Sequence, residues 1–140
     1  MGRKEAQALA SVPLFAGLSG RQLRTLADAG ERVEVGEGWK LVGEGEPGDD
    51  CYVILEGEAR VVSRSGRTLT RMFPGDFFGE ISLLDGGPRT ATVLAETPMV
   101  LFRLDRSGLA RIVKEDPGIG LRMLEQLARR FRRMEHPVVG

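Results

Sequence analysis

Hydrophobic and polar residues follow three successive patterns along this chain. In residues 9–30 and 105–135 the apolar positions recur every three to four residues, which is typical of amphipathic helices. Between them, in residues 31–104, short apolar runs alternate with a period of two and are separated by glycine-rich turns, which is typical of strands. The pattern predicts a mainly β protein with helices at both ends.

The first helical zone has a defined start. Ser19 and Gln22 stand three positions apart, as in a capping box, and the apolar residues Leu23, Leu26 and Ala27 then fall on one face. We therefore expect a short amphipathic helix that packs through this face and ends at the next glycine.

The β zone consists of six short apolar runs without a long helical segment. Many short strands joined by tight turns favour an antiparallel sandwich or small barrel of the jelly-roll type. We predict that residues 1–140 form one domain. The expected strands are RVEV, KLV, CYVILEGEARVV, LTRMF, ATVLAE and MVLFRL.

The final zone is expected to hold two helices. Asp105 is a suitable N-cap for the first helix, and Pro117 interrupts it. The segment KEDPGIG around this proline is a predicted hinge, and the last helix is expected to run to about Glu135.

The last helix carries an apolar stripe, which we interpret as a packed face. Arg130 falls at the edge of this stripe, so its stem can lie on apolar surface while its head reaches a ligand. The alternative is that the arginines around it form only a solvated face. The stripe consists of Leu124, Leu127, Phe131 and Met134.

Composition and charge exclude several kinds of protein. Lys plus Arg and Asp plus Glu number 20 each, and this balance argues against nucleic-acid binding by this chain alone. Cys51 lies in an apolar run and is interpreted as a small buried hydrophobe. The sequence has no membrane-spanning segment, and its N-terminus lacks the apolar core of a signal peptide. These features predict a cytoplasmic protein.

The stretch FGEISLLDGGPRTATV, residues 78–93, places one acid and one base in an otherwise apolar run. Gly79 lets the backbone approach a ligand, and the residues after it suit a short helical turn with free N–H groups. Arg89 is suited to a bidentate contact with a phosphate, to which Thr90 adds a hydroxyl. Because Glu80 would repel a phosphate, we expect it to accept a sugar hydroxyl. Together these residues indicate a phosphorylated ribose.

Each of the two charged residues also has a structural alternative. Glu80 can be a helix-start carboxylate favoured by the helix dipole, and Arg89 a surface arginine that follows a turn. The sequence contains no P-loop and no GxGxxG pattern, so few other phosphate sites compete with this stretch.

The same stretch closely resembles the phosphate-binding cassette of the cyclic nucleotide-binding domain family. This module occurs in catabolite activator proteins, kinase regulatory subunits and cyclic-nucleotide-gated channels. The resemblance continues in VPLFAGLS, GEGEPGDDCYVILEGEARV and RMFPGDFFGE, and covers about residues 9–135. It implies an antiparallel β-roll (a double-stranded β-helix or jelly roll) with N-terminal helices and a C-terminal lid helix.

The resemblance also implies roles for individual residues. Arg89 would pair with the exocyclic oxygens of a cyclic phosphate, and Glu80 would accept the ribose 2′-hydroxyl. The last helix would cover the base, where Arg130 would contact it. The implied binding residues are Gly79, Glu80, Ile81, Ser82, Arg89, Thr90, Ala91 and Arg130.

The expected function is that of a sensor that couples ligand binding to movement of its last helix. Cyclic AMP is the expected ligand in preference to cyclic GMP, although Thr90 also occurs in relatives that favour cyclic GMP. No cofactor or metal is expected. The alternative is an interaction module of the same fold that uses no nucleotide. An enzyme is disfavoured, because the only histidine, His136, lies in the tail and no His/Asp cluster exists.

One departure from the transcription-factor branch of the family concerns output. Only HPVVG follows Glu135, which is too short for a helix-turn-helix. We expect either a stand-alone binding protein, which the Met1 start favours, or the ligand-binding piece of a channel, transporter or regulated enzyme. The C-terminal helix is the expected contact for a second copy in a homodimer or for a neighbouring effector domain.

Overall fold

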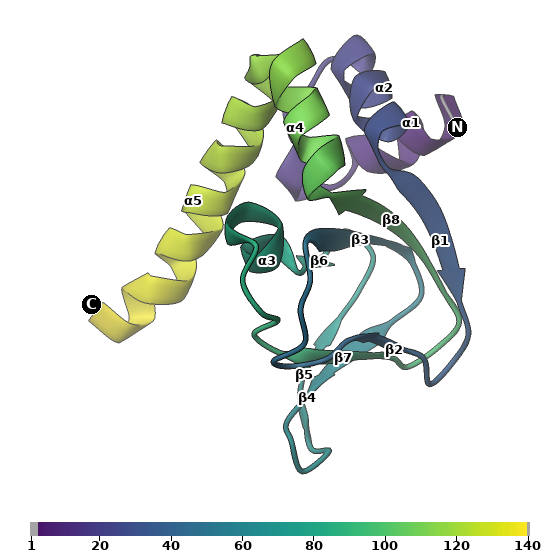
Figure 1. Cartoon of the computed structure of the whole chain (residues 1–140), viewed down its shortest axis with the longest axis vertical. Helices are drawn as coiled ribbons and strands as arrows, with labels where there is room; N and C mark the ends of the chain where they lie inside the picture. Colours follow the sequence, from purple (N-terminus) through teal and green to yellow (C-terminus); the bar gives the residue numbers. More distant parts are fainter. Residues whose placement is uncertain (1–2, 140) are drawn as a thin grey trace. The chain divides into compact units, whose positions relative to one another are not determined.

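The computed structural model of the chain describes residues 3–139, and among the side chains those of residues 4–133 (Figure 1). The chain divides into two compact units. The β unit is Gly30–Gly108, and the helical unit comprises residues up to Ala29 together with residues from Leu109 onwards. Among the described residues no helix is long and apolar enough to cross a membrane.

The β unit contains two four-stranded sheets, in the strand orders β1-β8-β3-β6 and β2-β7-β4-β5. All of the paired strands are antiparallel, so the predicted antiparallel fold with flanking helices is confirmed. The elements of this unit are β1 (Glu31–Val35), β2 (Lys40–Val42), β3 (Asp50–Glu56), β4 (Ala59–Val62), β5 (Thr68–Met72), β6 (Phe77–Phe78), α3 (Glu80–Asp85), β7 (Thr92–Ala95) and β8 (Met99–Asp105).

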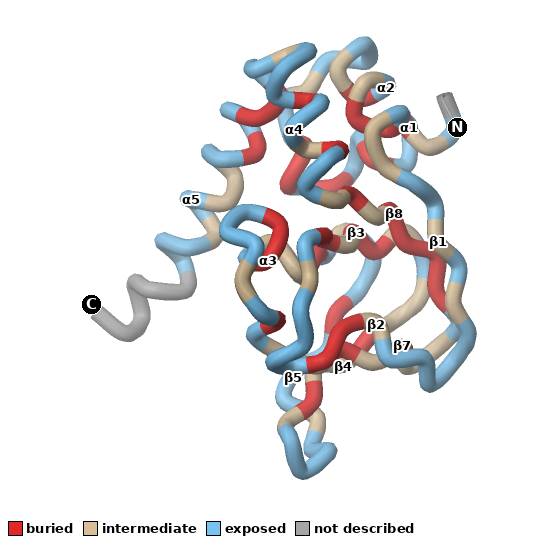
Figure 2. Tube along the Cα trace, in the orientation of Figure 1, coloured by how far each residue is buried: buried red, intermediate tan, exposed pale blue. Residues whose placement is uncertain are grey.

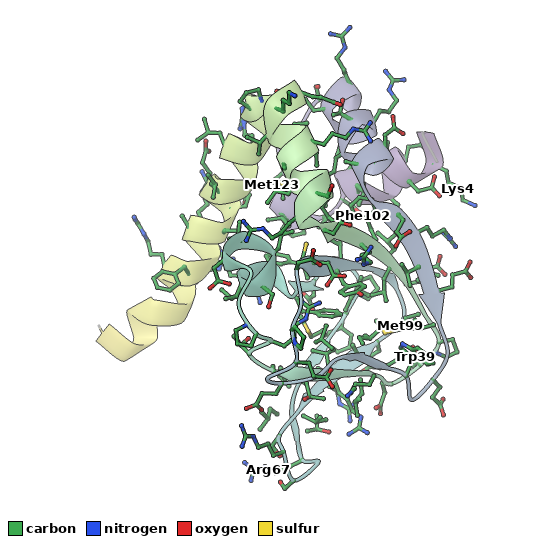
Figure 3. The ribbon with its side chains drawn as sticks, viewed as in Figure 1. Lys4, Trp39, Arg67, Met99, Phe102 and Met123 are labelled. Atoms are coloured by element: carbon green, nitrogen blue, oxygen red, sulfur yellow. The ribbon has the colours of Figure 1, made fainter. Side chains whose placement is uncertain are left out.

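Side chains from both sheets form one core. Ile54 and Leu101 from one sheet belong to the same buried cluster as Ala59 and Val93 from the other. Strand β8 is buried over most of its length (Figure 2). Because successive strand residues point to opposite faces, and both Leu101 and Phe102 are fully buried, β8 is covered on both sides (Phe102 is labelled in Figure 3).

The run CYVILEGEARVV forms two strands in different sheets, not the single strand that the sequence predicted. The chain leaves β3 at Glu56 and turns at Gly57, which has a φ of +93°. A Cβ atom on Gly57 would lie 2.5 Å from the carbonyl oxygen of Pro98. Glycine is therefore needed here both for its backbone angle and for its lack of a side chain.

The helical unit begins earlier than expected. The sequence predicted helical structure from residue 9, but the first helix starts at Arg3, and a short 3₁₀ turn separates it from the second. The elements of this unit are α1 (Arg3–Ala10), η1 (Pro13–Phe15), α2 (Gly20–Ala29), α4 (Arg106–Glu115), which starts at the end of the β unit, and α5 (Pro117–Val139).

The predicted capping box before α2 is confirmed. The backbone N–H of Ser19 donates to Oε1 of Gln22 at 3.0 Å, and the N–H of Gln22 donates to Oγ of Ser19 at 3.1 Å. The predicted apolar face, Leu23, Leu26 and Ala27, is buried.

Carboxylates cap both of the later helices. Oδ1 of Asp105 accepts the N–H of Gly108 at 2.7 Å, which confirms the predicted N-cap of α4. Oδ1 of Asp116 accepts the N–H of Gly118 at 3.1 Å in the same manner. Pro117 is the first residue of α5, where its missing N–H is not needed.

This start of α5 corrects the predicted hinge. Gly118 and Gly120 are helical, so only Asp116 separates α4 from α5. The helix also continues to Val139, past the expected end at Glu135.

The predicted stripe of α5 is not its packed face. Ile119 and Met123, four positions apart, are buried, whereas Leu124 and Phe131 are 55% and 62% exposed. The side chain of Met134 lies outside the described residues. The apolar stripe is therefore largely on the exposed part of the helix, and the packing of α5 depends on a different set of side chains.

Candidate functional site

Gly79 joins β6 to α3 and lies against two site residues. It has a φ of +86° and is the N-cap of α3. A Cβ atom at this position would lie 2.8 Å from the carbonyl oxygen of Asp50 and 3.0 Å from Nη1 of Arg89. The start of α3 therefore approaches the Arg89 guanidinium closely because residue 79 has no side chain.

Arg89 is buried and held through both its backbone and its side chain. Its residue exposure is 8%, and its Nη1 donates to the carbonyl oxygen of Asp50 at 2.6 Å while its Nη2 donates to the Asp50 carboxylate. The N–H of Arg89 donates to the carbonyl oxygen of Glu46 at 2.9 Å, and its own carbonyl accepts the N–H of Gly45 at 2.8 Å. The guanidinium is thus fixed in place, and the reading of Arg89 as a surface arginine is wrong.

Asp50 is shared between two guanidinium groups. Its Oδ2 accepts Nε of Arg103 at 2.5 Å, and the Tyr52 hydroxyl lies 3.4 Å from the same oxygen. Nη1 of Arg103 also donates to Glu31 at 3.0 Å. Burial lowers the pKa of Arg103, but its hydrogen bond to Asp50 and the Asp50 charge outweigh burial, so this pKa stands above its usual value. The result is a buried acid between two cations.

Glu80 is the first residue of α3, a helix that packs against β3. Its negative charge acts on the thiol of Cys51 in that strand. Burial raises the pKa of Cys51 to about 12, and the charges of Glu80 and Asp50 add to this effect. Cys51 is therefore a protonated, buried side chain, in agreement with its interpretation as a small hydrophobe.

The remaining cassette residues differ in burial. Ile81 and Thr90 are exposed, Ala91 is half-buried and Ser82 is buried. The carbonyl of Ser82 accepts the N–H of Gly86 at 2.9 Å, which closes the C-terminal end of α3. Their contacts with a ligand stay predictions.

Arg130 is the one predicted binding residue outside the β unit. It lies on α5 in the helical unit and is half-buried. Its contact with the base of a ligand therefore stays a prediction, whereas the backbone of Gly79 and the guanidinium of Arg89 do come together.

Sequence reasoning missed Asp50 and Arg103, although a signal for each was present. Asp50 stands directly before the apolar run CYVIL, and Arg103 stands between the apolar run MVLF and Leu104. A charged residue that enters a buried strand needs a partner of opposite charge, because burial of an isolated charge is costly. From the sequence, both residues could have been identified as charges in buried strands that require an oppositely charged partner. The sequence does not show that they pair with each other.

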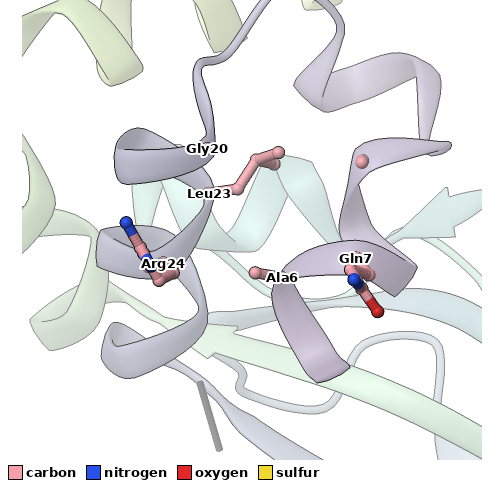
Figure 4. Close-up of a pocket in the computed structure, with 6 residues that line it drawn as sticks. Ala6, Gln7, Gly20, Leu23 and Arg24 are labelled. Carbon is pink, nitrogen blue, oxygen red and sulfur yellow. The ribbon is translucent and has the colours of Figure 1, made fainter. Parts of the chain in front are cut away.

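A pocket lies in the helical unit between α1 and α2 (Figure 4). This pocket has a volume of about 240 Å³, and its only charged lining residue is Arg24. It offers no acid for a sugar hydroxyl, so it does not match the predicted chemistry. In the part of the chain that the structure describes, no cluster of His, Cys, Asp or Glu suits a metal ion. The lining residues are Ala6, Gln7, Ala10, Gly20, Leu23 and Arg24.

Comparisons with known proteins agree with the geometry of the β unit. Residues 32–116 match the model of a family described as the cyclic nucleotide-binding domain. The chain is 36% identical over 129 residues to a CRP-like cAMP-activated global transcriptional regulator of Mycobacterium tuberculosis. This match covers 89% of the chain and 58% of the relative, so the chain spans somewhat more than half the length of that protein.

Two solved structures are similar over most of their length. The N-terminal domain of a transcriptional regulator from Streptomyces coelicolor superposes with a TM-score of 0.80 and 35% identity, covering 94% of each chain. A cyclic nucleotide-binding domain from Methylobacillus flagellatus gives a TM-score of 0.79 and 28% identity, covering 97% of this chain and 81% of that one.

The shared carboxylate leads to a prediction about stability. Asp50→Asn would leave two guanidinium groups close together without an anion, and breaking a buried ion pair typically costs about 3–5 kcal/mol. We expect the free energy of unfolding in urea to fall by about this amount. The matched control is Glu115→Gln, which breaks the exposed pair of Glu115 with Arg111 (3.0 Å) and should cost no more than about 1 kcal/mol. Equal losses in the two variants would contradict a structural role for Asp50.

Proposed function

Because the chain belongs to the cyclic nucleotide-binding domain family, we propose that its β unit binds a 3′,5′-cyclic nucleotide at residues 78–93 and acts as a regulatory sensor. The observation that carries this proposal is the buried Arg89 guanidinium, fixed beside the glycine that starts α3. A cation that is buried and already oriented loses little conformational freedom when an anion arrives.

The chemistry of the cassette suits a phosphorylated sugar. Two N–H groups of Arg89 are donated to Asp50, and a guanidinium has further N–H groups for the exocyclic oxygens of a phosphate. The first turn of α3 adds backbone N–H donors, and the exposed Thr90 can add its hydroxyl. Glu80 then accepts the ribose 2′-hydroxyl, because a carboxylate would repel the phosphate itself.

We propose cyclic AMP as the preferred ligand over cyclic GMP. The similar mycobacterial regulator is named as cAMP-activated, which supports this choice. Thr90 is an exposed residue, and its hydroxyl would favour the alternative if it bound the amino group of a guanine. We propose that the protein is a binding module and not an enzyme.

We propose that α5 covers the base and passes on the state of the site. The exposed side chains of Leu124 and Phe131 provide apolar surface that can pack on a base, on a second copy or on a neighbouring effector domain. The sharp junction at Asp116 and Pro117 allows the direction of α5 to change without disrupting the helix itself.

A module of the same fold that binds no nucleotide is the second candidate. That function would place no demand on Glu80 or Arg89, yet both residues are present and Arg89 is buried. Calorimetric titration of the chain with cyclic AMP and cyclic GMP separates the two candidates. Absence of heat with both nucleotides would eliminate the sensor function.

Removal of Arg89 should abolish most of the affinity. Arg89→Ala takes away one side of a desolvated charge pair, so we expect a loss of about 2–5 kcal/mol of binding free energy, or about 30-fold to several-thousand-fold in Kd. Calorimetry provides the measurement. The control is Arg60→Ala, whose guanidinium pairs with Glu96 at 2.8 Å, and this variant should bind as the wild type does. Normal binding by folded Arg89→Ala would remove Arg89 from the site.

The sugar contact can be tested with a ligand analogue. If Glu80 accepts the 2′-hydroxyl, the 2′-deoxy analogue loses a hydrogen bond to a charged carboxylate and should bind about 1–3 kcal/mol more weakly than the ribose form. In Glu80→Ala this difference between the two ligands should disappear. A wild-type protein that binds both forms equally would exclude the proposed role of Glu80.

The covering role of α5 can be measured by hydrogen exchange. Ligand should slow exchange in residues 78–93 and also in residues 121–135, because a closed state is favoured when the base is covered. The tip of the β4–β5 hairpin, where Arg67 lies (Figure 3), serves as an internal reference and should not change. If residues 121–135 exchange at the same rate with and without ligand, α5 does not cover the base.

A further inference from the structure

Arg103 lies outside the cassette, on β8. It donates a hydrogen bond to the carboxylate of Asp50, which also accepts a hydrogen bond from Arg89. Asp50 uses Oδ1 for Nη2 of Arg89 and Oδ2 for Nε of Arg103. The link depends on strand register, because β3 and β8 are antiparallel neighbours in which Tyr52 faces Arg103. The Arg103 side chain is 28% exposed, so solvent screens its pair with Asp50 only in part.

The second cation changes the charge that an anion would meet. An Arg89–Asp50 pair alone is neutral overall and attracts a phosphate weakly, whereas the trio of Arg89, Asp50 and Arg103 has a net charge of one unit positive. Glu31 and Asp105 also lie near Arg103, at 3.0 Å and 3.8 Å from its Nη1, but both are more exposed than Asp50 and are screened more strongly.

The second cation also limits how Asp50 can turn. With Oδ2 engaged by Arg103, rotation of the carboxylate toward a further N–H group of Arg89 would break this hydrogen bond. Those further N–H groups are the ones that a bidentate contact with a phosphate requires. Arg103 therefore affects both the net charge around Arg89 and the N–H groups that Arg89 can offer to a ligand, and it does so through Asp50.

We propose that Arg103 is a positioning residue for the nucleotide site, which acts through Asp50 to keep the Arg89 guanidinium oriented for the phosphate. This inference rests on the proposed function of the site. Under this proposal, strand β8 contributes to ligand affinity in addition to residues 78–93.

The test compares three variants by calorimetry with cyclic AMP and cyclic GMP. Arg103→Gln removes the charge and should weaken binding of both nucleotides by about tenfold, and by the same factor, because the base is not involved. Arg103→Lys keeps a positive charge beside Asp50 and should recover most of the lost affinity. The matched control is Arg60→Gln, since Arg60 is also a strand arginine in an ion pair and its side chain is 31% exposed.

A measurement without nucleotide separates this inference from the proposed function. The Nε–H signal of Arg89 in a ¹⁵N spectrum, assigned by its loss in Arg89→Lys, should shift or broaden in Arg103→Gln but not in Arg60→Gln. A merely structural role for Arg103 would lower thermal stability and leave both this signal and the affinity unchanged.

Each outcome has one meaning. Loss of affinity in Arg103→Gln with recovery in Arg103→Lys and a displaced Arg89 signal supports the inference. Unchanged affinity and an unchanged signal in Arg103→Gln overturn it, as does an equal loss in Arg60→Gln. If the wild type binds neither nucleotide, the proposed function fails; a displaced Arg89 signal would then support only the link through Asp50. If Arg103→Gln does not fold, unchanged affinity in Arg103→Met together with an unchanged Arg89 signal overturns the inference.

Discussion

The contact between the Arg89 guanidinium and Asp50 is the constraint on which the candidate site depends. Both residues are buried, and a buried charge is tolerated only when an opposite charge or several hydrogen bonds compensate for the lost water. Asp50 supplies its carbonyl oxygen as well as its carboxylate to Arg89. The start of β3 is thereby joined to the loop before β7, although these segments are 39 positions apart in the sequence.

This constraint also explains why the neighbouring backbone is shaped as it is. Gly79 must lack a side chain because its α-carbon lies against Asp50 and Arg89, and the chain at Gly45 and Glu46 fixes the backbone of Arg89. An anion that binds here meets donors that are already oriented, so little entropy is lost on association. The site is therefore preorganised by groups that also stabilise the fold.

The whole chain has no net charge, but its acidic and basic residues are distributed unevenly. The β unit contains more Asp and Glu than Lys and Arg, so its overall field does not favour an anion. The attraction for a phosphate that we propose would then come from the short-range arrangement of Arg89, Asp50 and Arg103. The charges of Arg89 and Asp50 are buried and screened little, whereas Arg103 is partly exposed. This is why the second cation matters to the proposed function, and why zero net charge says little about the ligand.

The sequence by itself determined the features that depend on local order. Period-two runs indicated the antiparallel sheets, Ser19 and Gln22 indicated the start of α2, and residues 78–93 indicated the family. The tertiary structure alone decided which charges are partners, because the pairing of Asp50 with Arg89 and Arg103 depends on strand register and loop position. It also decided which side of α5 is buried, since an apolar helical stripe specifies a face but not what that face will contact.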